Sequence, residues 1–378
     1  MNLQPYLKLM SEQHASDMYF TTGAPVSCRI EGALRPVGKS MLNPGMTKKL
    51  AYDLLSPAQI KDFEKNLELN LGVSYTDLGR FRINIYMQRG EVSMVIRYIR
   101  SEIPTIDELG LPEVYKTMIM RKKGLILIVG ATGMGKSTSL ASMLDHRNMN
   151  ENGHILTIED PVEFMFRHKK CIVSQREVGL DTLSFENALR EAMRETPDVI
   201  MIGESRDRET MESALRYADT GHLCLTTLHA TNAYQALDRM LNFFPGNTHN
   251  QVLMDLSLNL NCIMAQRLVK TEDGTRIPAI EVMANTPYIS KLIRDGNFHE
   301  ISDVMAKGND AEMKTFDQSL LELFKAGKIS LETALVNADS SSELEWKINF
   351  GGGMKEVGGS EEKEGELDFP DSSADLGK

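Results

Sequence analysis

The stretch that decides the fold of this 378-residue chain is Gly130-Ala131-Thr132-Gly133-Met134-Gly135-Lys136-Ser137. It fits G-x-x-x-x-G-K-[ST], a pattern whose glycines let backbone N–H groups close around a phosphate. An apolar run at 125–129 precedes the loop and a helical pattern follows it, so the loop leads into the positive end of a helix. We therefore predict an ATP site in which Lys136 reaches the β- and γ-phosphates, Ser137 binds Mg²⁺ and Thr138 adds a contact.

Two further apolar strand patterns run into carboxylates. The first, at 198–204, ends at Glu204, and the second enters an acidic cluster that contains Glu159, Asp160 and Glu163. Because the carboxyl ends of parallel strands share the functional edge of an open α/β sheet, these acids are expected beside the phosphate loop. We predict that Glu204 holds Mg²⁺ or a water molecule. The alternative for each acid is a solvated loop charge, and it has more weight for the 159–163 cluster.

A third apolar strand pattern, at 223–228, is bracketed by His222 and His229. His229 belongs to the same carboxyl edge, where a phosphate sensor is expected, although a histidine that caps the core fits the pattern too. Three arginines, Arg80, Arg82 and Arg97, lie on two paired strands of the N-terminal region. Ring-shaped ATPases supply arginines from a neighbouring domain or subunit, and a solvated strand face is the alternative.

The pattern along the chain divides it into four parts. Residues 1–100 mix short helices and strands, which indicates an α+β domain, and residues 101–116 read as a proline- and glycine-punctuated linker. Residues 117–338 begin with alternating apolar strands and helices, the signature of an α/β parallel sheet. After Tyr234 the pattern predicts helices only. Residues 339–378 form an acidic tail for which we predict disorder from about residue 350.

Individual elements follow from periodicity and turn residues. In the N-terminal region we expect a helix at 5–13, helical segments over 47–63 that break at Ser56-Pro57, a hairpin turn at Glu31-Gly32 between 26–30 and 33–37, and two strands at 80–86 and 92–99. In the second region the strands are expected at 125–129, 155–158, 199–202 and 223–228. The expected helices are 113–121, 136–144, 185–194, 207–219, 236–243, 250–262, 288–295 and 315–326.

Charge and composition exclude several classes of protein. The net charge is −11, and the last forty residues alone carry −7, which argues against binding to nucleic acid through a large basic face. The longest apolar run has eight residues, too short to span a membrane, and the N-terminus lacks the apolar centre of a signal peptide. The four cysteines have no metal-ligand spacing, so we expect no structural zinc. These features predict a cytoplasmic protein.

Four motifs occur in a fixed order: the phosphate loop, the acidic stretch 157–164, the strand that leads into Gly203-Glu204-Ser205-Arg206-Asp207, and the stretch from Gly221 to His229. Together they resemble the type II/IV secretion ATPase superfamily and, within it, the PilT/PilU family of type IV pilus retraction ATPases. The resemblance covers about residues 1–335. Departures from the usual PilT motifs, such as Ala131, Met134 and Ser205, and the acidic tail are more similar to the PilU branch.

The resemblance implies an N-terminal PAS-like domain, a RecA-like ATPase domain and a homo-hexameric ring that hydrolyses ATP. Such a ring would act at the cytoplasmic base of the pilus on an inner-membrane platform protein, with a PilT-type paralogue as partner. It also implies site roles: Glu204 and Glu163 would be catalytic, His229 and His222 would form a histidine pair, and the three arginines would be candidates to reach ATP.

Other functions stay open from the sequence. The main alternative is an ATP-binding ring subunit that does not turn over and supports a PilT paralogue. A pilus-assembly or type II secretion ATPase is disfavoured, because those proteins usually carry an additional N-terminal domain and a tetracysteine zinc motif. A RecA-like nucleic-acid translocase is disfavoured by the net charge.

Overall fold

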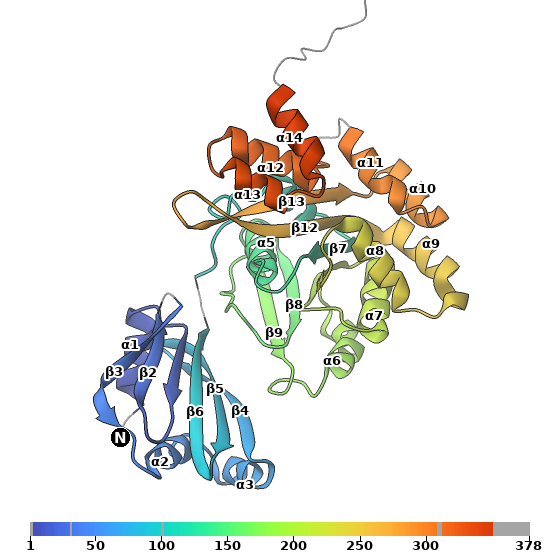
Figure 1. Cartoon of the computed structure of the whole chain (residues 1–378). Coiled ribbons are helices and arrows are strands. Elements are labelled where there is room, and N and C mark those ends of the chain that lie inside the picture. The colour runs from blue at the N-terminus through green and yellow to red at the C-terminus, as the bar shows by residue number, and fades with distance from the viewer. Residues whose placement is uncertain (1–2, 31, 100–101, 308–311, 351–378) are drawn as a thin grey trace, which may run out of the picture.

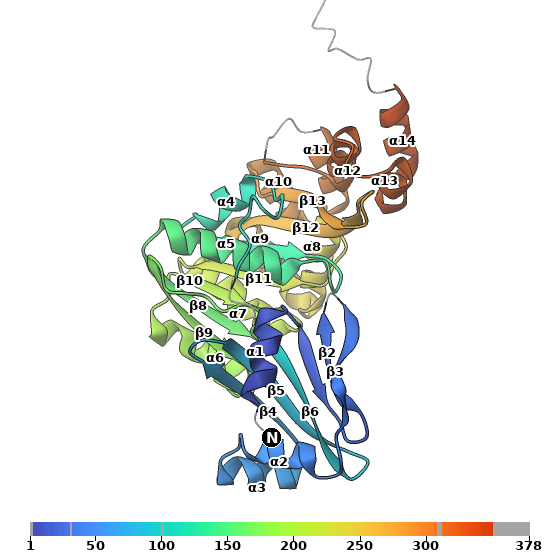
Figure 2. The same ribbon diagram turned by 90° about the vertical axis from the view of Figure 1, so that its left-hand side faces the viewer.

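Figure 1 shows two sheets, each with its own helices, in the computed structural model of the chain. The structure describes residues 3–30, 32–99, 102–307 and 312–350. The N-terminal sheet lies at one end of the second domain, on the side away from helices α11 (His299–Lys307), α12 (Phe316–Lys325), α13 (Leu331–Asn337) and α14 (Ser341–Phe350) (Figures 1 and 2).

The N-terminal domain is a six-stranded sheet in the order β3-β2-β1-β6-β5-β4, antiparallel throughout. Its strands are β1 (Asp17–Phe20), β2 (Pro25–Ile30), β3 (Ala33–Met41), β4 (Glu68–Tyr75), β5 (Gly79–Gln88) and β6 (Glu91–Ile99). The alternation in β5 confirms the predicted half-buried strand, because Phe81, Ile83 and Ile85 are fully buried. The core is completed by helices α1 (Gln4–Glu12), α2 (Met46–Tyr52) and α3 (Pro57–Asn66). The predicted turn at Glu31-Gly32 includes Glu31, which is outside the described residues.

The second domain contains a seven-stranded sheet in the order β13-β12-β7-β11-β10-β8-β9. Its strands are β7 (Gly124–Val129), β8 (Gly153–Glu159), β9 (Cys171–Glu177), β10 (Val199–Ile202), β11 (Leu223–Leu228), β12 (Leu260–Lys270) and β13 (Arg276–Ala284). All neighbouring pairs are parallel except β12 with β13. Alternate residues of β7 enter two different core clusters, so both faces of the sheet are covered, as the continuous apolar runs predict.

Helices cover both faces of this sheet. One core cluster joins it to α4 (Val114–Ile119) and α5 (Lys136–Asn150). The other joins it to α6 (Phe185–Ala192), α7 (Arg208–Asp219), α8 (Ala233–Asn242), α9 (His249–Asn259) and α10 (Pro287–Asp295), and reaches the C-terminal helices. Since β7, β8, β10 and β11 are parallel, their carboxyl ends meet at one edge, where the loops that carry the predicted site residues begin.

The prediction of helices alone after Tyr234 is wrong. Helix α9 ends at Asn259 and the chain continues directly into β12, which pairs with β7 and with β13. No glycine or proline separates α9 from β12, so the apolar pattern carries no local signal of the change. The neighbouring β7 supplies the hydrogen-bond partners that make residues 260–270 extended, and that neighbour is more than a hundred residues away in sequence.

The first part of the segment predicted as an acidic tail, 339–378, is ordered. Residues 341–350 form α14, whose Leu344 is buried in the second domain's core. The buried Leu344 side chain holds α14 against the domain. The low apolar content of this part of the sequence does not predict such a contact. Residues 351–378, on which the prediction of disorder mainly falls, are outside the described part of the chain.

Candidate functional site

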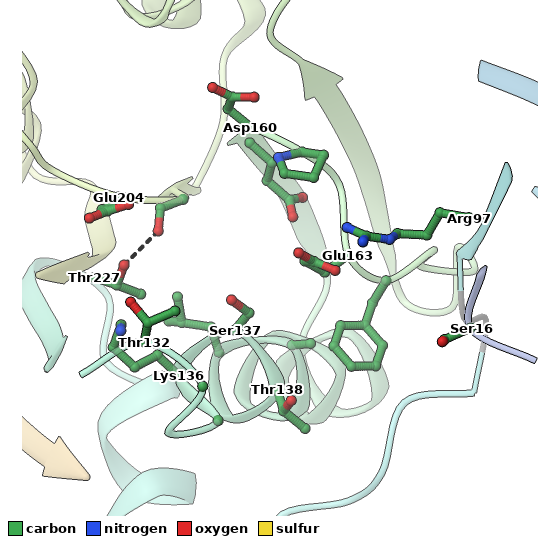
Figure 3. Close-up of a pocket in the computed structure, with 18 of the residues that line it drawn as sticks. Ser16, Arg97, Thr132, Lys136, Ser137, Thr138, Asp160, Glu163, Glu204 and Thr227 are labelled. Carbon is green, nitrogen blue, oxygen red and sulfur yellow. Dashed lines mark hydrogen bonds between the residues drawn. The ribbon is translucent and has the colours of Figure 1, made fainter. Parts of the chain in front are cut away.

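A cleft of about 1140 Å³ lies between the two domains, at the carboxyl edge of the second sheet (Figure 3). The second domain contributes the phosphate loop, the acidic stretch and the segments after β10 and β11. The N-terminal domain contributes the end of α1, the start of β1 and the end of β6. Lining residues from the predicted site are Thr132, Gly133, Gly135, Lys136, Ser137, Thr138, Glu159, Asp160, Glu163, Glu204, Arg97 and His229.

The phosphate loop connects β7 to α5 as the motif predicts. Gly133 and Gly135 have φ of 78° and 84°, the left-handed region that favours glycine, and α5 begins directly after Gly135. Lys136 is buried, and its Nζ donates to the carbonyl oxygens of Gly130 and Ala131 at 2.8 and 3.0 Å. Burial lowers the pKa of Lys136, and the nearby Glu204 carboxylate opposes this shift. The ammonium group is therefore held at the mouth of the phosphate cradle.

Glu204 follows β10 and lies between two basic side chains. His229 Nε2 is 2.9 Å from Glu204 Oε1, and Arg206 Nε donates to Glu204 Oε2 at 2.7 Å. Burial and then the charge of Lys136 lower the pKa of His229, so a neutral imidazole with its proton on Nε2 donates to Glu204. The loop before Glu204 is held by Thr227, whose hydroxyl donates to the Gly203 carbonyl at 2.7 Å. Glu204 thus has a defined position in the lining of the cleft.

The acidic stretch separates into buried and exposed members. Glu159 is 7% exposed and accepts hydrogen bonds from Thr157 Oγ1 at 2.7 Å and Gln175 Nε2 at 3.3 Å. Its burial raises the pKa of Glu159 to about 7. Asp160 and Glu163 are exposed on the loop that follows β8, and Figure 3 shows the Glu163 carboxylate facing the Arg97 guanidinium across the cleft. Glu163 is therefore the member of the cluster that faces the N-terminal domain.

Arg97 is the one of the three predicted arginines that lines this cleft. Its Nε donates to Asp17 Oδ1 at 2.9 Å, and this hydrogen bond is the main cause that raises the pKa of Arg97. Arg82 instead lies 3.4 Å from Glu177 Oε1 on β9. The charge of Arg80 also acts on Glu177, and its buried Nε has no hydrogen-bond partner among the described residues. Arg82 therefore contacts the second domain beside the cleft, where Arg80 acts on the same carboxylate through its charge, and neither arginine lines the cleft.

His222 does not lie with His229. It precedes β11, and its ring contacts Thr220 Oγ1 at 3.2 Å and the edge of Tyr217. His229 follows the same strand, and six strand residues separate the two by about 20 Å. The predicted histidine pair is thus divided between opposite edges of the sheet, because a strand carries its two ends apart.

Several residues at the site are absent from the sequence prediction. Arg206 belongs to the motif Gly203 to Asp207, and its position two residues after Glu204 is the signal that could identify it. Asp17, which holds Arg97, and Arg276, which lines the cleft from β13, have no local signal. Their positions follow from strand pairing, β1 with β6 and β12 with β13, which the sequence pattern does not reveal.

The described residues contain no group of three His, Cys, Asp or Glu side chains arranged to hold a metal ion. Ser137 and Glu204 both line the cleft (Figure 3), and hydroxyl and carboxylate oxygens are donors that suit Mg²⁺ bound together with phosphates. No helix in the described ranges is long and apolar enough to cross a membrane.

Comparison with known proteins gives a consistent result. The model of the family described as Type II/IV secretion system protein matches residues 2–323. The chain is 49% identical over 352 residues to the type IV pilus ATPase PilU of Pseudomonas aeruginosa, across 93% of this chain and 92% of that protein. It is 41% identical over 334 residues to the type IV pilus retraction ATPase PilT of the same organism, across 88% and 97%. The crystal structure of the pilus retraction motor PilT with bound ADP superposes with a TM-score of 0.85 at 42% identity, across 91% of this chain and 99% of that one.

Proposed function

Because the chain belongs to the type II/IV secretion system protein family, we propose that it is an ATP-hydrolysing motor that powers type IV pilus retraction and twitching motility. The observation that carries the proposal is one cleft lined by phosphate-loop residues, Lys136 and Ser137 among them, together with Glu204 and Arg97. The relatives' names include PilU and PilT ATPases, and the similar solved structure has ADP bound.

In the proposed reaction the phosphates of ATP lie on the N–H groups of the loop from Gly130 to Ser137, and Thr138 borders them. Lys136 exchanges its two loop carbonyls for phosphate oxygens. Ser137 and Glu204 would hold Mg²⁺, which would supply positive charge beside the phosphates. Glu204 orients the attacking water and accepts its proton, while His229 and Arg206 keep the carboxylate in place.

Two groups from the far side of the cleft complete the proposed chemistry. Arg97 stabilises negative charge that develops on the transferred phosphoryl group, and Asp17 keeps the guanidinium extended. Glu163 faces Arg97 (Figure 3), and its negative charge attracts the guanidinium group as the cleft changes shape. The cleft lies between domains, so a change in their relative position on hydrolysis would be transmitted as mechanical work.

We propose the following organisation for the whole motor. Residues 1–100 form a PAS-like domain, 101–116 a linker, and 117–338 a RecA-like ATPase domain, followed by α14 and the acidic segment beyond it. Six copies form a ring at the cytoplasmic base of the pilus, where the ring acts on an inner-membrane platform protein and works with a PilT-type paralogue. The alternative, a ring subunit that binds ATP without turnover, is disfavoured by the intact Lys136, Ser137 and Glu204.

The test is ATP hydrolysis by the purified protein with Mg²⁺. Lys136→Ala should abolish binding and turnover, because among the described residues it removes the only lysine that lines the cleft. Glu204→Gln keeps the size and should retain ATP binding while it lowers kcat by at least about 100-fold. Lys291→Ala, on the exposed surface of α10, serves as the control with unchanged kinetics. Wild type that binds ATP but is as inactive as Glu204→Gln would favour the non-catalytic ring subunit.

A genetic experiment separates the motor from the scaffold. Chromosomal Glu204→Gln is compared with deletion of the gene, each with and without any PilT-type paralogue, and pilus retraction is scored under load. A motor requires its own hydrolysis, so Glu204→Gln should reproduce the defect of the deletion. If Glu204→Gln retracts like wild type while the deletion fails, the protein acts as a scaffold.

A further inference from the structure

Strand β12 places a buried glutamine directly against the phosphate loop. Gln266 is 3% exposed, and its Nε2 donates to the Met134 carbonyl in the loop at 2.7 Å. Its Oε1 accepts from the Ser139 hydroxyl, on the first turn of α5, at 2.9 Å. One amide therefore connects the loop, the helix that follows it and the neighbouring strand, and both of its ends are paired.

The two partners fix which way the amide points. A backbone carbonyl can only accept a hydrogen bond, so the NH₂ end must face Met134. The oxygen end then faces Ser139, whose hydroxyl can rotate to donate. Ser139 is itself 1% exposed, so water does not compete for this contact. A reversed amide would oppose two oxygen atoms inside a buried site, a costly arrangement.

Two glycines of the motif also pack on Gln266. A Cβ at Gly130 would lie 2.6 Å from the Gln266 carbonyl oxygen, and a Cβ at Gly135 would lie 2.8 Å from Gln266 Nε2. The loop therefore rests on both the backbone and the side chain of this residue. A second contact of β12 with the loop adds to the support, since the Leu268 N–H donates to Met134 Sδ at 3.3 Å.

We propose that Gln266 is a positioning residue for nucleotide binding, which holds the phosphate loop in its binding conformation while Ser139 sets the direction of its amide. This inference rests on the proposed binding of ATP phosphates in the loop. The N–H groups of the loop bind phosphate only when they point toward one position. Contacts that hold the loop in that conformation should therefore increase its affinity for ATP. Gln266 touches no reacting atom, so its effect should appear in the Kd and KM for ATP and much less in kcat.

The experiment measures ATP binding to the full chain by calorimetry, together with KM, kcat and the melting temperature without nucleotide. Gln266→Met keeps the length of the side chain and removes both hydrogen bonds, so Kd and KM should rise about tenfold. Gln266→Glu keeps the shape of the side chain and the acceptor for Ser139, but it places an oxygen against the Met134 carbonyl. Its Kd and KM for ATP should therefore rise at least as much as those of Gln266→Met. Gln251→Met, at an exposed position of α9, is the control with unchanged binding.

Ser139→Ala tests the orienting step. It should weaken binding about threefold, and Ser139→Ala combined with Gln266→Met should bind no more weakly than Gln266→Met alone, because Ser139 acts through the amide. Wild type that fails to bind ATP would overturn the proposed function and this inference with it. Wild type that binds ATP, with both Gln266 variants at the wild-type Kd, would overturn the inference alone, whatever their melting temperatures.

Discussion

Glu159 and Glu163 have nearly the same sequence context and very different environments. Glu163 is exposed in the cleft, whereas Glu159 is buried with hydrogen bonds from Thr157 and Gln175. Both were predicted as site residues from the same acidic cluster. A sequence motif does not encode side-chain burial. Burial therefore distinguishes Glu163, which is accessible to a cation, from Glu159, whose neutral form is favoured.

The raised pKa of Glu159 leads to a prediction for stability. Below pH 4.5 the side chain is neutral in the folded and the unfolded chain, so its burial costs little. As the pH rises from 4.5 to about 7 the unfolded chain loses a proton that the folded chain retains, so stability falls. Glu159→Gln avoids this cost. Without nucleotide, the variant should equal wild type near pH 4.5 and exceed it by about 3 kcal/mol at pH 8.

Urea unfolding at several pH values checks this prediction. Glu68→Gln, at an exposed position of β4 in the other domain, is the matched control, and its stability should stay within about 0.5 kcal/mol of wild type. A stability difference for Glu159→Gln that does not grow with pH would mean that Glu159 is ionised in the folded protein.

Element-scale features show where sequence patterns suffice. β7, β10 and β11 were predicted nearly to the residue, because strands buried on both faces are continuous apolar runs bounded by turn residues. The sequence pattern predicts neither β9 nor β12. β9 is an edge strand with mixed burial, and β12 continues from α9 without a break. Both strands depend on hydrogen bonds to a neighbouring strand for their conformation, so local periodicity identifies them poorly.

β12 also anchors the C-terminal helices through Arg267, which follows Gln266. Arg267 Nη1 donates to the Asn337 carbonyl at 2.7 Å, and Nη2 lies 2.6 Å from Asp339 Oδ1. Its guanidinium lies 3.8 Å from the centre of the Phe316 ring. Adjacent residues on a strand face opposite sides, so one strand contacts the phosphate loop on one side and the C-terminal helices on the other.

These contacts predict that Arg267→Ala lowers the free energy of unfolding by about 2 kcal/mol, because it removes a stacked cation, a partly buried hydrogen bond to Asn337 and the ion pair with Asp339. Arg267→Lys should recover less than half of the loss, since lysine lacks the planar fork. Arg294→Ala, on the exposed side of α10, should cost less than about 1 kcal/mol. Urea unfolding measures all three. Full recovery by Arg267→Lys would reduce the role of Arg267 to its charge alone.

At the scale of the whole molecule, the arrangement of the two domains decides which arginine faces the cleft. Arg82 and Arg97 are direct partners on β5 and β6. Arg97 nevertheless faces Glu163 across the cleft, while Arg82 contacts Glu177 on β9. The sequence pattern does not distinguish the three arginines, because all of them lie on the same pair of strands. Their different positions relative to the second domain give them different partners.

This separation predicts different kinetics for two variants. Arg97→Ala should lower kcat at least tenfold with a smaller change in KM, because an arginine aimed at the phosphoryl group stabilises charge that develops in the transition state. Arg82→Ala should leave kcat within about threefold. Steady-state ATP hydrolysis measures both. Unchanged turnover in Arg97→Ala would remove it from the site, and an equal loss in Arg82→Ala would show that Arg82 also reaches ATP.

The sequence by itself determined the phosphate loop, the strand and helix that flank it, and the acidic ends of neighbouring strands. These features are local: glycine conformations, apolar runs and the position of a residue at the end of a strand act over a few residues. Only the tertiary structure decided that Asp17 holds Arg97 from eighty residues away, that Gln266 supports the loop, and that His222 lies away from His229. Such contacts arise from strand pairing and domain packing, which join residues that no local pattern relates.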